Sequence, residues 1–299
     1  MSGSPETILV ATDFSDASAR AVARGAWLAR QHKARLTLVH STGEGDWLAR
    51  LADHSHGAFS HEMWTKAAVA ALARIRRALE DQGHVGIATE VVAQPLHQCL
   101  GSLVHDDGIG LLVMGALGER GIRAKLLGST ADRALRAGVV PVLLVRGDPT
   151  KAYRHVALAT DFSPVSAHST ALGLWLAPDA SHYLLHASEI PLDRGLAFAN
   201  LSRETLDEYR SQFQREVGDR IEAFATAVGP VARAAVRAPR EGAPGRVLEA
   251  FVREADIDLV VLGARARARW EANLLGSTAL FAVNGLKCDV LLVPEPVVG

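Results

Sequence analysis

The chain has 299 residues, and its 32 lysine and arginine side chains nearly balance its 33 aspartate and glutamate side chains, which leaves a formal net charge of −1 at pH 7. This balance excludes a protein that nucleic acid or an anionic membrane attracts through its overall charge. No apolar run approaches the ~18 residues of a membrane-spanning helix, and the N-terminal sequence lacks the apolar core of a signal peptide. The sequence therefore favours a soluble, cytoplasmic protein with no nucleic-acid partner and no membrane partner.

The first half of the chain alternates short apolar runs with amphipathic stretches of helical period. The apolar runs predict buried strands, and Asp13 with Ser15 or Ser18 is placed to cap the helix after the first strand. The predicted strands span residues 7–11, 36–40, 89–93, 109–114 and 139–145, and the later helices of this half span 61–81, 96–106 and 129–137.

The second half repeats this order of elements, with strands over 155–159, 183–186, 232–236, 258–262 and 290–293 and helices over 202–228 and 245–254. Strands that alternate with helices in single file specify a parallel sheet with helices on both faces. We therefore predict two tandem five-stranded α/β domains, residues 1–147 and 153–299, with a linker at about 147–152. Because this linker is short, we expect the two domains to pack together.

One glycine motif occurs twice, at a constant offset of 148 residues. Its first copy reads Gly115-x2-Gly118-x9-Gly128-Ser129-Thr130, and its second copy keeps Gly263, Gly276, Ser277 and Thr278. The sequence Ala-Thr-Asp-Phe-Ser precedes each copy, at residues 11–15 and 159–163, again 148 residues apart. A chain that repeats both a strand-end acid and a glycine loop at one offset has duplicated a nucleotide-binding unit.

The residue types of this motif suit a nucleotide. In an open parallel sheet, ligands bind beyond the carboxyl ends of the strands, and both Asp13 and Gly115 follow a predicted strand. A carboxylate there can accept hydrogen bonds from ribose hydroxyls, while glycine lets backbone amides approach phosphate. A helix that opens at Ser129 adds free amides, a favourable dipole and hydroxyl donors for an anion.

The combined pattern of strand-end acid and glycine loop resembles the universal stress protein family over nearly the whole chain, as a tandem of two such domains. The resemblance implies a Rossmann-like α/β fold that, in the ATP-binding branch of the family, holds an adenine nucleotide. It also implies pairing of domains through the last strand, and hence a homodimer with four domains. The family's adenine-pocket and phosphate-loop positions map to Ala11, Thr12, Asp13, Val39, Gly115, Gly118, Gly128, Ser129 and Thr130.

The second half departs from the family pattern at one position. It keeps the candidate binding residues Asp161, Gly263, Gly276, Ser277 and Thr278, but Ala266 replaces a loop glycine. Three arginines at positions 265, 267 and 269 lie in the same loop, where they could pair with phosphate, fill an empty pocket or bridge to the other domain. We therefore expect the first site to be the better one.

Several of these residues have a plainer alternative role. Asp13 and Asp161 could serve only as helix caps, although caps would not require the distant glycine loop. His40 and His186, which close the second strand of each half, either border the pocket or are hydrogen-bonded strand-end histidines. The polar segment with His54, His56 and His61 is interpreted as a solvated loop, so we predict no protein metal site.

No catalytic motif accompanies the candidate site, and the lysine of a Gly-x4-Gly-Lys-Ser/Thr loop is absent. We therefore expect an ATP-binding regulatory protein of the stress response, with Mg²⁺ on the phosphates and at most slow hydrolysis. The alternatives are a nucleotide-independent interaction scaffold and a slow ATPase. Cys99 and Cys288, at non-equivalent places, are expected to stay reduced.

Overall fold

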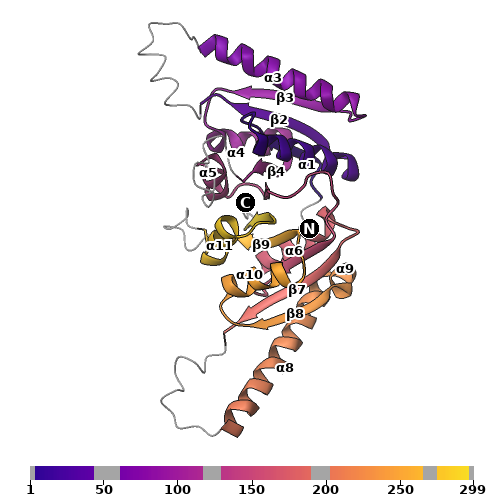
Figure 1. The fold of residues 1–299 in the computed structure, drawn as a ribbon, viewed down its shortest axis with the longest axis vertical. Coiled ribbons are helices and arrows are strands. Elements are labelled where there is room, and N and C mark those ends of the chain that lie inside the picture. The colour runs from indigo at the N-terminus through magenta and orange to yellow at the C-terminus, as the bar shows by residue number, and fades with distance from the viewer. Residues whose placement is uncertain (1–3, 44–60, 117–128, 190–202, 265–274, 296–299) are drawn as a thin grey trace. The chain divides into compact units, whose positions relative to one another are not determined.

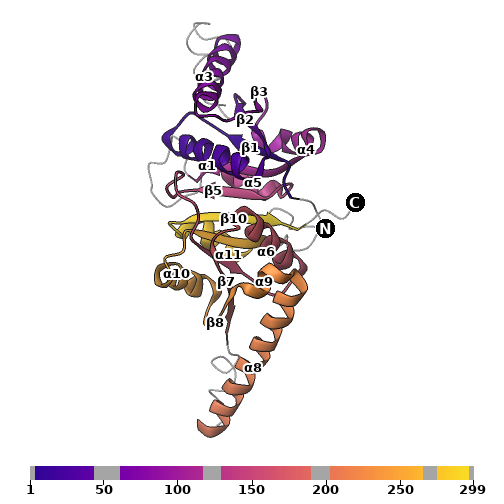
Figure 2. The same ribbon diagram turned by 90° about the vertical axis from the view of Figure 1, so that its right-hand side faces the viewer.

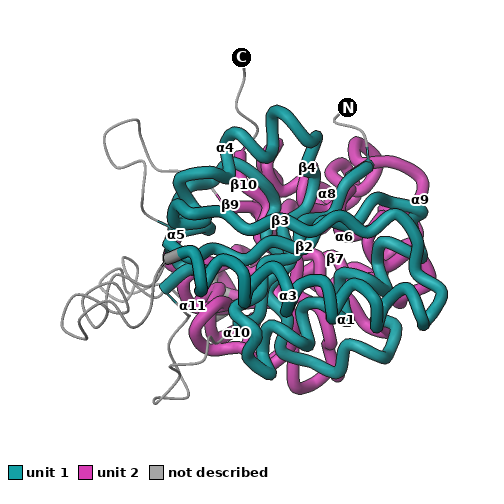
Figure 3. The backbone as a smooth tube through the Cα atoms, turned by 90° about the horizontal axis from the view of Figure 1, so that it is seen from above, with its two compact units in different colours: residues 1–152, 266–275, 296–299 teal, residues 153–265, 276–295 magenta. Residues whose placement is uncertain are grey.

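The structure is a computed structural model that describes residues 4–43, 61–116, 129–189, 203–264 and 275–295 (Figure 1). The chain divides into two compact units, the first built on residues 1–152 and the second on residues 153–265 and 276–295 (Figure 3). None of the helices in the described ranges combines the length and the apolar character needed to cross a membrane.

The first unit is a five-stranded parallel sheet in the order β3-β2-β1-β4-β5. The strands are β1 (Thr7–Ala11), β2 (Arg35–Ser41), β3 (Ile87–Val92), β4 (Ile109–Gly115) and β5 (Val142–Val145). The helices are α1 (Asp16–His32), α3 (His61–Asp81), α4 (Leu96–Asp107) and α5 (Ser129–Ala137). Because right-handed crossovers reverse direction after β3, α1 and α3 cover one face of the sheet and α4 and α5 the other (Figure 2).

The second unit repeats this topology, with the parallel order β8-β7-β6-β9-β10. Its strands are β6 (His155–Ala159), β7 (Ser181–Ser188), β8 (Val236–Glu241), β9 (Leu259–Ala264) and β10 (Asp289–Pro294). Its helices are α6 (Pro164–Leu176), α8 (Arg203–Val228), α9 (Pro230–Ala234), α10 (Pro244–Glu254) and α11 (Ser277–Gly285). The predicted fold class, two tandem five-stranded α/β units, is confirmed.

Two predicted strands start three or more residues away from their start in the structure. The strand predicted over 232–236 is wrong, because Pro230 begins the short helix α9 and β8 starts only at Val236. β8 lies at the edge of its sheet and carries a proline and two arginines, so its sequence lacks the apolar run that marks a buried strand. The last strand of the first unit starts at Val142 rather than 139, after Pro141, whose carbonyl accepts from the amide of Leu112 at 2.9 Å.

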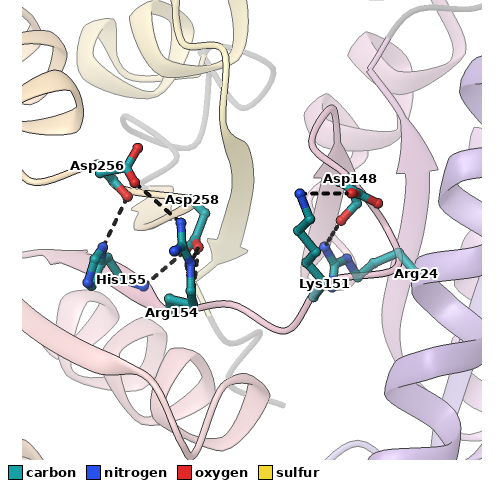
Figure 4. A network of polar contacts seen from close by, with 7 residues as sticks. All are labelled: Arg24, Asp148, Lys151, Arg154, His155, Asp256 and Asp258. Atoms are coloured by element: carbon teal, nitrogen blue, oxygen red, sulfur yellow. Dashed lines mark hydrogen bonds and ion pairs between the residues drawn. The ribbon is translucent and has the colours of Figure 1, made fainter.

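The segment after β5 is held on α1 by a buried arginine (Figure 4). The guanidinium of Arg24, only 2% exposed, donates to the carbonyls of Lys151 at 2.7 Å and Asp148 at 2.8 Å. The Asp148 carboxylate accepts from the amide and the hydroxyl of Thr150, and these hydrogen bonds lower the pKa of Asp148 to about 2. The position 148 residues after Arg24 is Leu172, so this tie belongs to the first unit alone.

The start of the second unit has a carboxylate contact of its own, also drawn in Figure 4. The carboxylate of Asp258 accepts from the backbone amides of Arg154, at 3.0 Å, and His155, at 3.0 Å, and thereby fixes the first residue of β6 beside β9. The side chain of Arg154 lies 3.3 Å from the carboxylate of Asp256. Neither Cys99 nor Cys288 forms a disulfide.

Candidate functional site

The order in which strands are added to the sheet reverses between β1 and β4 in the first unit and between β6 and β9 in the second. Such a reversal opens a crevice at the carboxyl ends of the two strands, where doubly wound proteins bind their ligands. In the first unit, Asp13 follows β1 and Gly115 ends β4, so the structure brings the strand-end acid and the first motif glycine to this switch point. Gly118 and Gly128 lie outside the described residues.

The turn from β1 into α1 is organised by the side chain of Asp13. Its Oδ1 accepts from the amide of Ser15 at 3.1 Å and from the hydroxyl of Ser15 at 2.5 Å. The Ser15 Oγ in turn accepts from the amide of Ser18 at 3.2 Å and caps α1. Asp13 is exposed, so it orders the loop while its carboxyl group remains at the surface.

The predicted adenine-pocket residues lie at different depths. Ala11 is half-buried at the end of β1, and Thr12 is buried, with its amide donating to the Val39 carbonyl at 2.9 Å. Val39 is only 1% exposed, and β2 continues to Ser41. The side chain of Val39 therefore belongs to the core, and Ser41 is the residue at the strand end that sequence reasoning missed.

A histidine supports the same loop from β2. The Nδ1 of His40 lies 2.8 Å from the carbonyl oxygen of Thr12. Because a carbonyl can only accept, Nδ1 carries the hydrogen. The imidazole is stacked on the ring of Phe14, with centroids 4.4 Å apart, and Phe14 has a left-handed φ of 65°. His40 is thus a hydrogen-bonded strand-end histidine that also borders the candidate site.

The second unit reproduces this loop. The Oδ1 of Asp161 accepts from the amide of Ser163 at 3.1 Å and from the hydroxyl of Ser166 at 2.5 Å. The Nδ1 of His186 donates to the carbonyl of Thr160 at 2.8 Å, and Phe162, also with φ 65°, lies 4.2 Å from the His186 ring. Burial lowers the pKa of His186 below its ordinary value, which favours the neutral imidazole.

The first glycine of each motif copy is required by helix packing. A Cβ at Gly115 would be 2.7 Å from the carbonyl carbon and oxygen of Ala17, in the first turn of α1. A Cβ at Gly263 would be 2.8 Å from Cγ1 of Val165, in the first turn of α6. These two glycines hold the acid-bearing helix turn close to the fourth strand, a role that spacing in the sequence does not reveal.

Later motif residues lie at the beginning of a helix. Ser129 is exposed and Thr130 half-buried at the start of α5, and Ser277 and Thr278 occupy the same positions in α11. Gly276 caps α11 without a side-chain hydrogen bond, and nothing lies within 4 Å of a Cβ built there. Ala266 and the three arginines of its loop lie outside the described residues.

These observations define a duplicated, doubly wound α/β protein with a polar site at the switch point of each unit. The sequence model of the universal stress protein family matches residues 5–146 and 152–294. The chain therefore belongs to the universal stress protein family, as a tandem of two family domains.

A curated relative is similar in sequence to half of the chain, and two solved structures share its fold. The chain is 27% identical, over 149 residues, to the universal stress protein YxiE of Bacillus subtilis, a match that covers 46% of this chain and 97% of YxiE. A universal stress protein structure from Archaeoglobus fulgidus has a TM-score of 0.66 at 16% identity and covers 98% of this chain and 99% of its own. The functionally unknown protein PA1789 of Pseudomonas aeruginosa has a TM-score of 0.64 at 18% identity, with coverage of 97% and 93%.

Proposed function

We propose that the chain is an ATP-binding regulatory protein of the stress response, in which the first domain, residues 1–147, carries the better site. The observation that supports this proposal most is the arrangement at the first switch point. An exposed carboxylate, Asp13, ends β1, Gly115 ends β4, and the hydroxyl-bearing start of α5 belongs to the same motif. An acid, backbone amides and a helix N-terminus are the groups that ribose and phosphate require.

In this proposal each part of the nucleotide has its own set of residues. The carboxylate of Asp13 binds the ribose hydroxyls, and backbone groups near Ala11, Thr12 and Val39 border the adenine. The phosphates bind at Gly115, Gly118, Gly128, Ser129 and Thr130. In the second domain, residues 153–299, the corresponding set is Asp161, Gly263, Gly276, Ser277 and Thr278.

The start of α11 fits an anion in one respect. Gly276 caps this helix without a side-chain hydrogen bond, so no capping side chain competes with an anion for the first amides of α11. A divalent ion would bind together with the triphosphate, because phosphate oxygens are ligands that Mg²⁺ prefers. ATP supplies three linked phosphates and bound Mg²⁺, while the protein binds and orients them.

The test is direct measurement of nucleotide binding. Protein purified under native conditions is expected to carry adenine nucleotide in mass spectrometry and to melt at a higher temperature with millimolar ATP. Asp13→Asn should weaken ATP binding, whereas Asp16→Asn, a change at the exposed acid that begins α1, should not. Protein that carries no nucleotide and shows no thermal shift would overturn the proposal.

A nucleotide-independent scaffold is the second candidate, and a specific observation favours it. Asp13 orders the turn before α1, and Gly115 allows α1 to pack against β4. Both residues of the motif therefore stabilise the fold even without a ligand. The discriminating variant is Gly118→Ala, which copies Ala266 into the first loop. Loss of ATP binding in the variant supports the sensor. Unchanged ATP binding, or no ATP binding in the wild type and the variant alike, supports the scaffold.

Self-association through the last strand of each domain is a separate proposal. Light scattering is expected to show two chains per particle. A clean monomer would remove this part of the proposal without affecting ATP binding.

A further inference from the structure

The aromatic ring of the acid-bearing loop is covered differently in the two units. In the second unit, the Phe162 ring contacts His186 and has the guanidinium carbon of Arg220, from α8, at 4.6 Å from its centroid. Phe224, one turn further along α8, meets the same ring edge-on at 5.9 Å. Phe162 is thus held between an imidazole and a guanidinium.

The equivalent residue of the first unit, Phe14, is more exposed than Phe162. Phe14 has the same backbone conformation as Phe162, with φ 65° in both, and the same histidine stack. Phe14 is nevertheless 40% exposed, which is a large exposed fraction for a phenylalanine. One face of the Phe14 ring packs on His40.

The covering helices show why the two rings differ. The buried residues Val217 and Ile221 of α8 lie 149 residues after the buried residues Ala68 and Leu72 of α3. At this offset, Arg220 corresponds to Ala71. The side chain of alanine ends at Cβ and cannot reach across a ring as arginine does.

A guanidinium and a nucleobase bind to an aromatic ring in the same way. Both are flat groups that lie against the π face. The stabilisation from either contact is similar in size to that from a stack of two aromatic rings. Arg220 and a base therefore compete for the same face of Phe162. In the first unit no such competitor stands at the matching helix position.

We propose that the residue at this helix position decides which unit accepts an aromatic base: Ala71 leaves Phe14 open as a stacking platform for the base of a bound nucleotide, and Arg220 closes the equivalent platform on Phe162. This inference rests on the proposed function and names the contact that would select the base. The second site would accordingly favour ligands that offer phosphate without a base.

Two reciprocal variants test the proposal by calorimetric titration with ATP, adenosine and inorganic tripolyphosphate. Ala71→Arg should lower the affinities of the first site for ATP and adenosine about tenfold or more. It should leave the affinity for tripolyphosphate unchanged or higher, because the added charge attracts phosphate. Arg220→Ala, a change at an exposed residue, should create adenosine binding in a protein whose first site carries Asp13→Asn.

Arg220→Lys is the matched control, because it keeps the charge and loses the planar group; it should bind adenosine more weakly than Arg220→Ala and more strongly than the unchanged second site. If the wild-type protein binds ATP and a folded Ala71→Arg protein binds it with the same affinity, the inference is wrong and the proposed function stands. Adenosine binding gained by Arg220→Ala in a chain whose wild-type form binds no ATP would overturn the proposed function of the first site alone. Absence of binding in every variant would overturn both.

Discussion

The backbone of Ala17 lies against the Cα of Gly115, so closely that a Cβ at position 115 would be 2.7 Å from the Ala17 carbonyl. Gly115→Ala must therefore displace the first turn of α1 or the end of β4. We expect a loss of roughly 1–3 kcal/mol in the free energy of unfolding, measured by denaturant titration. Gly276→Ala is the matched control from the second unit, because its Cβ would meet nothing within 4 Å. Equal stability of the two variants would contradict this packing role.

The buried guanidinium of Arg24 makes a second prediction possible. Arg24→Leu installs the residue found at the equivalent position of the second unit and removes both donors to the carbonyls of Asp148 and Lys151. Hydrogen bonds from a charged group are worth about 1.5–3 kcal/mol, so the segment after β5 should open more often. Limited digestion with trypsin should cleave faster after Lys151. Arg30→Leu, a change at an exposed arginine of the same helix, should leave the cleavage rate unchanged.

A buried carboxylate in the second unit has a tyrosine as its donor. Asp289, fully buried at the start of β10, accepts from the hydroxyl of Tyr153 at 2.6 Å. Tyr153→Phe should lower the free energy of unfolding of the second unit by about 1.5–3 kcal/mol, because a charged acceptor loses a short hydrogen bond. The control is Tyr209→Phe on the exposed side of α8, which should change stability by less than about 0.5 kcal/mol. A Tyr153→Phe protein as stable as the control would refute this role for the hydroxyl.

Three histidines make the second unit sensitive to acid. Burial lowers the pKa values of His168, His182 and His186 below the ordinary value of 6.5. Below pH 6.5 the unfolded chain binds protons that the folded unit does not, so stability rises with pH in this window and is lost as the pH falls toward the folded-state pKa values. Above pH 6.5 these three histidines do not change the free energy of unfolding with pH.

Hydrogen exchange followed by mass spectrometry can measure this effect in each unit separately. After correction for the intrinsic exchange rate, β7, which carries His182 and His186, should lose more protection than β1 between pH 7.5 and pH 5.5. His182→Gln should reduce the difference. Equal loss of protection in the two strands would show that the buried histidines do not control acid sensitivity.

Much of the fold could be predicted because the relevant signals are local. The helices over His61–Asp81 and Ser129–Ala137 have the predicted bounds, since their apolar period continues up to polar or capping residues. β8 could not be found in the same way, because an edge strand with Pro239 and two arginines has no apolar run. The helix that begins at Pro230 could not be predicted for a related reason, because its five residues are too few to show a helical period.

The candidate site shows the same division between local and tertiary information. The repeated acid and glycines located both switch points from the sequence alone, because spacing along the chain is preserved by duplication. The contact of Gly115 with Ala17 and the stack of Arg220 on Phe162 join residues far apart in the sequence, and no periodicity encodes them. The one-residue change of offset between α3 and α8 also conceals the match of Ala71 with Arg220.

The loop that joins the first strand to its helix is almost identical in the two units, down to the left-handed phenylalanine and the histidine that donates to the threonine carbonyl. Each molecule therefore holds an internal reference for that loop, at the same concentration, temperature and ionic strength as its counterpart. A spectroscopic difference between His40 and His186 within one sample reports only what surrounds the loop. Differences in preparation between two separate proteins cannot enter that comparison.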